Sequence, residues 1–185
     1  TLLVDILNYC DAARAYTGYK ANESVTTGLT EEQRALATAT REYDSVLNPK
    51  AVEIANPLAT WKAANLKMYH AIRMQIRFEL DESVDISTIT AKVLVGDEER
   101  VGYITESADY PGQYILIVDE IYGRQMSSVV SVTLYQGKTA ISNTVTYSVE
   151  SYAAAKCNDS NEKLRNLVIA IMHYGDSAKN YLTSK

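Results

Sequence analysis

The middle of the chain alternates between apolar and polar residues, whereas both ends repeat their apolar residues every three to four positions. Residues 72–80 show the alternation most clearly. Their polar positions are Arg73, Gln75, Arg77 and Glu79. A period of two is typical of a strand with one buried and one solvated face. A period near 3.6 is typical of an amphipathic helix. The pattern therefore predicts a β-rich centre between helical ends.

Several further short segments have strand-like composition and are separated by turn residues. They are residues 89–95, 100–105, 114–118, 130–134 and 141–147, with 61–69 as an additional candidate. Gly96–Glu99, Pro111-Gly112 and Gln136–Lys138 lie between them and predict turns. Short strands at this spacing favour an antiparallel sandwich over a parallel sheet. We therefore expect an α+β protein, in which an antiparallel Ig-like β-sandwich of about six to seven strands packs with N-terminal and C-terminal amphipathic helices.

The N-terminal part is expected to be helical. Apolar residues recur at helical spacing over residues 1–20, and Gly18 is a plausible end for this helix. Thr30 and Gln33 have the spacing of a capping box, in which each residue satisfies a backbone amide of the other. A short second helix is therefore predicted from Thr30 to about Thr40.

The C-terminal part is expected to hold two more helices. Ser148 is placed to begin a short helix over residues 149–157. Asp159 and Glu162 again have capping-box spacing, and the long last helix that follows has one apolar face. We interpret the chain as one compact unit of three segments. They are an N-terminal helical segment and linker (1–58), the sandwich (59–148) and C-terminal helices that pack with the N-terminal helix (149–185).

The first and last helices resemble each other. Residues 2–16 align without gaps to residues 167–181, and six of the fifteen positions are identical. The shared pattern is Tyr-x-Asp-x-Ala-basic-x-Tyr. We interpret it as a helix-packing face in which the small residues Cys10 and Gly175 allow a close approach. A repeat at this distance also suggests a modular parent protein. Because the chain opens inside a helical pattern, we expect it to be a piece of a longer polypeptide.

Charge and hydropathy exclude two classes of partner. The formal net charge is −5, from 18 basic and 23 acidic residues. The basic residues are scattered and form no stripe that would follow a phosphate backbone. The apolar runs, such as residues 167–172, are far shorter than the roughly 20 residues that span a bilayer. We therefore expect no nucleic-acid partner and no membrane insertion.

The two cysteines leave an alternative open. Cys10 and Cys157 both fall on predicted helices. They can form one disulfide, or both can be small residues that pack as free thiols.

An ordered set of motifs resembles a known module. The motifs lie in residues 2–9, 16–19, 29–35, 59–64, 142–152 and 172–176. The module recurs in large secreted and cell-surface proteins of gut Clostridia, particularly ruminococci. Those proteins often also carry dockerins, carbohydrate-binding modules or glycoside hydrolases. The resemblance implies a secreted or cell-surface bacterial location and neighbouring domains in the same polypeptide. Cys10 departs from it, since a glycine usually follows that tyrosine.

The sequence shows no pattern that indicates catalysis. His70 and His173 belong to no metal-binding or nucleophile motif. The acidic residues lie mostly at turns, where they are common for conformational reasons. We therefore expect a monomeric protein that is not an enzyme and has no catalytic residues, no metal and no cofactor.

Carbohydrate binding is the function that the residue types favour. Sugars stack their C–H faces on aromatic rings and hydrogen-bond to polar side chains. The candidate ligand-binding residues are Trp61, Tyr103, Tyr110, Tyr114, Tyr122, Gln113 and Arg124. The polar face of residues 72–80 carries no aromatic residue, which argues against a flat stacking platform there. We expect a glycan-interacting accessory module of a larger, cellulosome-like surface protein. The alternative is a structural spacer or protein-interaction module whose tyrosine rings are buried.

Overall fold

The computed structural model describes residues 1–44, 52–68 and 71–184. Within these residues the protein is α+β, with four α-helices and two antiparallel sheets. The chain divides into two compact units. The helical unit comprises Thr1–Val46, Gly123–Ser127 and Val149–Lys185, and the sheet unit comprises Leu47–Tyr122 and Ser128–Ser148. Residues 123–127, expected in the sandwich segment, therefore belong to the helical unit.

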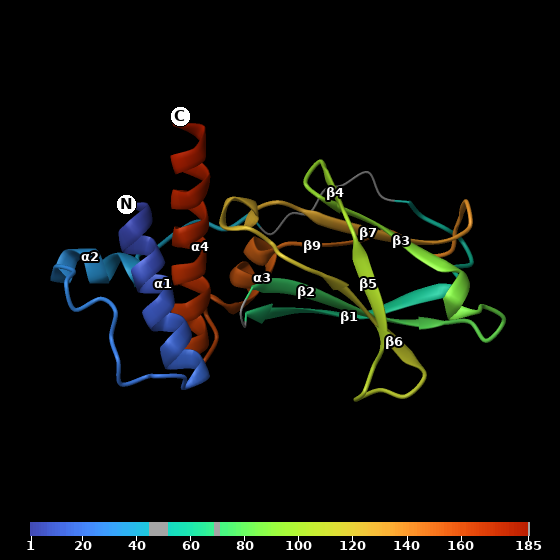
Figure 1. Cartoon of the computed structure of the whole chain (residues 1–185), viewed down its shortest axis with the longest axis horizontal. Coiled ribbons are helices and arrows are strands. Elements are labelled where there is room, and N and C mark those ends of the chain that lie inside the picture. Colours follow the sequence, from blue (N-terminus) through green and yellow to red (C-terminus); the bar gives the residue numbers. More distant parts are fainter. Residues whose placement is uncertain (45–51, 69–70, 185) are drawn as a thin grey trace. The chain divides into compact units, whose positions relative to one another are not determined.

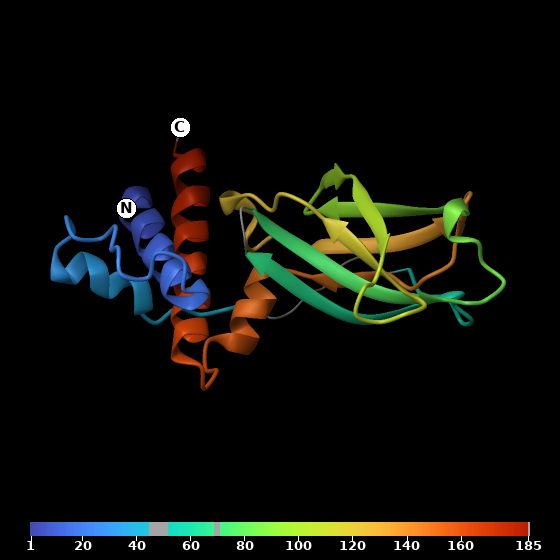
Figure 2. The same ribbon diagram turned by 60° about the horizontal axis from the view of Figure 1, so that its bottom comes forward.

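The sheet unit consists of two antiparallel sheets in two layers (Figure 1, Figure 2). The first sheet has the order β1-β2-β6-β5, formed by Ala59–Met68, Ile72–Leu80, Gln113–Val118 and Gly102–Glu106. The second has the order β4-β3-β7-β8, formed by Glu98–Arg100, Ile89–Val95, Val130–Gln136 and Thr139–Ala140, with β9 (Val145–Tyr147) also paired to β7.

The alternation in β2 decides which side chains form the core. Met74, Ile76 and Phe78 are fully buried, whereas the residues between them are not. Val93 from the second sheet and Leu116 from β6 are also fully buried. Because burial of such side chains contributes roughly 1.5–3 kcal/mol each, the period of two is enough to fix the inner face of the sheet.

Gly102 marks a place where the two sheets approach closely. A Cβ atom at this position would lie 2.8 Å from Leu116 Cδ1 and 2.9 Å from Val93 Cγ2. Both distances are shorter than van der Waals contact, so the core has no room for a larger residue here.

Two strand predictions and one turn prediction need correction. The strand expected over residues 100–105 is split at the exposed Val101, so that β4 pairs with β3 in one sheet and β5 pairs with β6 in the other. The four-residue turn expected after β3 is shorter, since Gly96 adopts a positive φ of 61° and β4 begins at Glu98. The last expected strand, residues 141–147, is shortened to β9 and preceded by β8 at Thr139–Ala140, because the Ser142 hydroxyl accepts the hydrogen bond of Leu134 N.

The helical unit begins with α1 (Leu2–Thr17), which ends at Gly18 in the left-handed conformation. The capping box is confirmed: Thr30 accepts from Gln33 N, and the Gln33 side chain accepts from Thr30 N. The helix that it starts is short, with α2 at Glu31–Ala35 followed by a 3-10 turn at Leu36–Thr38.

The C-terminal helices are α3 (Val149–Lys156) and α4 (Glu162–Thr183). The N-cap of α4 is Asn161, whose side chain accepts from Lys163 N and Leu164 N, and not Asp159 as the spacing suggested. Asp159 instead accepts from Asn161 N and so orders the residue that caps the helix. No described helix is both long and apolar enough to cross a bilayer.

Helices α1 and α4 pack antiparallel and lie side by side in both views (Figure 1, Figure 2). The Ser177 hydroxyl donates to Asp5 near one end of the contact. The small residue Gly175 makes room for Met126 and not for α1, since an added Cβ would lie 2.6 Å from Met126 Cγ. Cys10 and Cys157 are both free thiols.

Candidate functional site

The first sheet places a mixed apolar and polar surface on the side opposite its core. Residues directly paired in an antiparallel sheet point to the same side. The rows Asn65–Gln75–Ile117–Tyr103 and Ala63–Arg77–Ile115–Thr105 are paired across β1, β2, β6 and β5. Since Met74, Ile76 and Phe78 point inward, these rows point outward. We call the surface formed by Asn65, Gln75, Arg77, Tyr103, Ile115 and Ile117 the outer face.

Two tyrosines meet this face. Tyr103 belongs to it through β5, and its side chain is 57% exposed. Tyr110 reaches it from the loop between β5 and β6, where the Arg77 guanidinium carbon lies 3.4 Å from the centre of the Tyr110 ring. This cation–π contact orients both side chains, while Tyr110 stays 49% exposed. Ile115 and Ile117 lie half-buried on β6, one of the two inner strands of this sheet.

A chain of polar contacts borders the outer face. Lys62 Nζ lies 2.6 Å from one oxygen of Glu79. Gln113 Nε2 donates to the other oxygen at 2.5 Å. The hydrogen bond from Lys62, with a smaller effect from Gln113, holds the pKa of Glu79 below its ordinary value. Glu79 therefore stays ionised at neutral pH and keeps the Gln113 amide in one orientation.

A pocket of about 300 Å³ lies at the loop between β5 and β6. It is lined by Glu106, Ser107, Pro111, Gly112, Gln113 and Tyr114. Ser107 N donates to Gln113 O, which closes the hairpin above the last strand pair. Ser107 is only 7% exposed. Its Oγ and the Oε1 of Gln113 are buried without a hydrogen-bond partner among the described residues. Buried polar groups usually have partners, so this pair is unusual.

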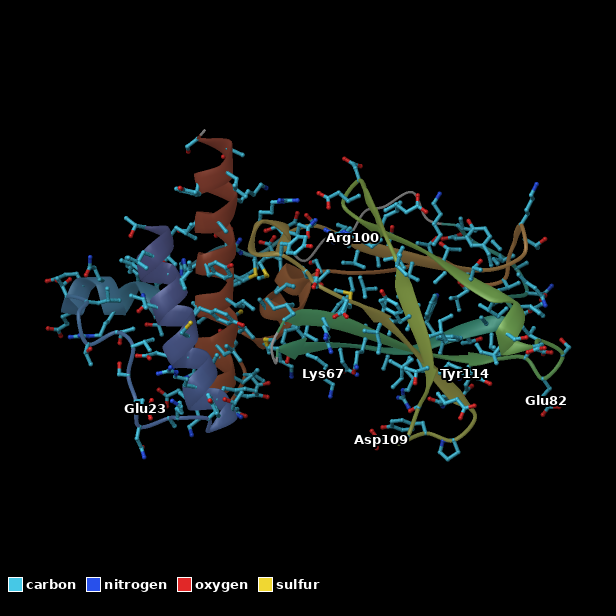
Figure 3. The ribbon with its side chains drawn as sticks, in the orientation of Figure 1. Glu23, Lys67, Glu82, Arg100, Asp109 and Tyr114 are labelled. Carbon is cyan, nitrogen blue, oxygen red and sulfur yellow. The ribbon has the colours of Figure 1, made fainter. Side chains whose placement is uncertain are left out.

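Two of the predicted binding residues lie on the inner side of the sheet. The Trp61 ring packs edge-on against Phe78 at 5.5 Å, and its Nε1 donates to Asn143 O at 2.7 Å. The Tyr114 ring lies 5.7 Å from Phe78. Tyr114, which is labelled in Figure 3, is also one of the residues that line the pocket. Trp61 thus closes the edge of the core and offers no ring to the outer face.

The two remaining candidates lie elsewhere. Tyr122 donates to Glu120, and the Arg100 guanidinium lies 4.8 Å from the centre of its ring. Arg124 lies in the 3-10 turn Gly123–Gln125, which belongs to the helical unit. The structure therefore places Tyr103, Tyr110 and Gln113 from the predicted set on one side of the first sheet.

The outward side of β2 by itself carries no aromatic side chain, as its sequence indicates. The neighbouring β5 and its loop bring Tyr103 and Tyr110 to the same side of the sheet. Sequence reasoning also missed Ser107, because no local pattern marks a serine whose hydroxyl is buried by a loop.

The other candidate groups have ordinary structural partners. His173 Nε2 lies 3.0 Å from Ala39 O, and His70 lies outside the described residues. Asp81 accepts from Ser83 N, and the bonds from Ser83 lower the pKa of that carboxyl. In the part of the chain that the structure describes, no three His, Cys, Asp or Glu side chains gather as a metal site.

The chain matches no protein-family model, and comparison with curated proteins and with solved structures found no match either.

Proposed function

We propose that the sheet unit binds carbohydrate through its outer face and serves as a non-catalytic accessory module of a larger bacterial surface protein. The observation that carries this proposal is the convergence of Tyr103, Tyr110 and Arg77 on one side of a sheet with half-buried isoleucines between them. A sugar ring has apolar C–H faces and a rim of hydroxyls. The outer face has aromatic and aliphatic side chains for the C–H faces and polar side chains for the hydroxyl groups.

The geometry suits a short stretch of a glycan chain. Tyr103 and Arg77 lie on β5 and β2, which flank β6 and are about 10 Å apart across the sheet. The two residues belong to adjacent outward rows. The exposed ring of Tyr103 and the aliphatic surface of Ile117 are on the same row, so a sugar ring can lie across them. Gln75 and Asn65 continue that row and provide amide donors and acceptors for hydroxyl groups.

The wider context of the proposal has separate support. The order β1-β2-β6-β5 corresponds to A-B-E-D of Ig-like sandwiches, and β4-β3-β7 with β8 and β9 both paired to β7 corresponds to C′-C-F-G, which supports an Ig-like assignment. The resemblance to modules of secreted and cell-surface clostridial proteins supports an extracellular location. A fold of this type hosts many functions, so the outer face carries the functional proposal.

The test is affinity gel electrophoresis of the whole chain in gels that contain starch, pectin, xylan, mannan or β-glucan. We expect retardation by at least one of them. Tyr103→Ala and Tyr110→Ala should each weaken binding about ten-fold, because each removes a stacking surface. Tyr122→Ala is the matched control, since Tyr122 is 43% exposed in the same unit and is not part of the outer face.

Two results would contradict the proposal. One is the absence of retardation in every gel. The other is retardation that Tyr103→Ala and Tyr110→Ala leave unchanged, or that Tyr122→Ala reduces equally.

A second candidate is a structural spacer or protein-interaction module without a carbohydrate ligand. The packing of Trp61 and Tyr114 against Phe78 favours it, because two of the predicted binding rings serve the core. This candidate predicts no retardation in any gel.

A further inference from the structure

The pocket at the loop between β5 and β6 has features that packing alone does not explain. Ser107 is a small polar residue in a position that is 93% hidden, and its hydroxyl meets no partner among the described residues. An alanine would fill the same space without leaving a polar group unsatisfied. A buried hydroxyl of this kind can take its hydrogen bond from an ordered water or from a ligand.

The second unsatisfied atom is held in place by its neighbours. Gln113 Nε2 faces Glu79, which is a pure acceptor when ionised. The amide oxygen must therefore be the end that points the other way, and Oε1 is the buried atom without a partner. Lys62 fixes Glu79 in turn. The pocket thus contains one fixed acceptor beside one hydroxyl that both donates and accepts.

The lining of the pocket limits what can enter. Pro111 and Tyr114 contribute apolar walls, and Gly112 has a positive φ of 79° that turns the chain around the opening. A volume of about 300 Å³ is at the lower end of the range for small-ligand sites. Glu106 lines the pocket, and Asp109 lies in the same loop, at its far end in Figure 3. The acidic Glu106 in the lining opposes a negatively charged ligand.

We propose, building on the proposed function, that this pocket binds one neutral glycosyl residue through two adjacent hydroxyl groups. One sugar hydroxyl donates to Gln113 Oε1 and the next exchanges a hydrogen bond with Ser107 Oγ. The sugar ring packs against Pro111, while the Tyr114 ring stays on Phe78. Gln113 lies on β6 in the same outward-facing series as Ile115 and Ile117. The pocket therefore continues the outer face and holds a chain end or a side branch of the glycan.

The first experiment follows backbone amide signals by NMR while methyl glycosides are added to the whole chain. The probes are methyl glycosides of glucose, xylose, mannose and galactose, with the methyl glycoside of galacturonic acid as the charged comparison. We expect saturable shifts at Ser107 and Gln113 with at least one neutral probe and none with the galacturonide. The absence of saturable shifts with every neutral probe would overturn the proposal. A stronger response to the galacturonide would overturn its preference for neutral sugars.

The second experiment uses substitutions. Ser107→Ala should weaken binding of the neutral probe by about five- to ten-fold. It should leave the melting temperature unchanged or raised, because it removes an unsatisfied hydroxyl. Thr90→Ala, an exposed threonine on β3 of the other sheet, is the control and should change neither quantity. Equal binding by Ser107→Ala and the unaltered protein would contradict a role for this hydroxyl.

The two proposals fail differently. Loss of polysaccharide retardation in Tyr103→Ala, with no effect of Ser107→Ala on any ligand, would keep the outer face and reject the pocket. Saturable shifts at Ser107 and Gln113 without retardation in any gel would keep the pocket and reject polysaccharide binding by the outer face.

Discussion

Tyr9 and Tyr174 stack in parallel, with their ring centres 5.7 Å apart and their planes 9° apart. The two residues occupy equivalent positions in the repeated segments 2–16 and 167–181. Because α1 and α4 run antiparallel, the contact brings the same element of the repeat together from both helices. The two copies of the repeated segment therefore pack against each other, one from α1 and one from α4.

The stack should contribute strongly to the helical unit. Tyr9→Ala removes a mostly buried ring and its aromatic contact, and we expect a loss of about 3 kcal/mol in the free energy of unfolding. Tyr19→Ala is the control, since that ring is 67% exposed, and should cost well under about 1 kcal/mol. Urea denaturation followed by the helical circular dichroism signal measures both. Similar losses from the two substitutions would argue against the importance of the stack.

Burial also predicts an alkaline instability. Desolvation, with added repulsion from the Cys10 thiolate and the Tyr174 phenolate, raises the pKa of Tyr9 to about 12 from an ordinary value of 10.0. The folded state thus keeps a proton that the unfolded state loses. This contribution is fully present below pH 10 and is lost as the pH rises towards 12, by about 2–3 kcal/mol.

Tyr9→Phe tests this pH dependence because it keeps the ring and removes the titrating group. Denaturation at a series of pH values should show a shallower loss of stability above pH 10 in Tyr9→Phe than in the unaltered chain. Tyr19→Phe should follow the unaltered chain. Parallel curves for all three proteins would show that Tyr9 titrates normally in the folded state.

Arg41 joins three segments of the helical unit. Its Nη1 donates to Glu150 at 2.7 Å, and its Nε and Nη2 form a bidentate pair with Asp176 at 2.6 and 2.8 Å. The side chains of Arg41 and Glu150 are only 13% and 10% exposed. Arg41→Met leaves the Glu150 carboxylate buried without its counter-charge, and should cost about 3–5 kcal/mol of unfolding free energy.

Two further variants separate the effect of the buried network from the effect of losing any positive charge. Arg41→Lys keeps the charge but cannot form the bidentate pair, so we expect an intermediate loss. Lys20→Met removes an exposed ion pair with Glu23 and should cost less than about 1 kcal/mol. If Arg41→Met and Lys20→Met proved equally mild in urea denaturation, the buried network would not matter for stability.

The sheet unit has its own test at Gly102. Gly102→Ala places a methyl group against Leu116 and Val93 and should cost about 1–3 kcal/mol. The neighbouring Val101→Ala changes a side chain that is 68% exposed and should be nearly neutral. Trp61 is the only tryptophan in the chain and lies in the sheet unit, so its fluorescence reports this unfolding. An unchanged midpoint for Gly102→Ala would show that the sheets can separate to admit the methyl group.

Local sequence patterns predicted the elements whose structure depends only on residues close together in the sequence. The alternation in residues 72–80 predicted β2 and its inner face, since successive side chains of a strand point to opposite sides. The spacing of Thr30 and Gln33 predicted a capping box for the same reason, because all its atoms lie within one turn. The break at Val101 was missed, since its strand-like composition fits either sheet.

The candidate site depended on pairing between distant segments. The sequence by itself determined that β2 would have a polar side, and that Tyr103, Tyr110 and Gln113 were suitable for contact with a sugar. Only the tertiary structure decided that β5 and its loop lie beside β6, so that these residues share one side of the sheet with Arg77. The physical reason is that periodicity sets the direction of a side chain within its strand. The identity of the neighbouring strands follows from how both sheets bury their apolar faces together.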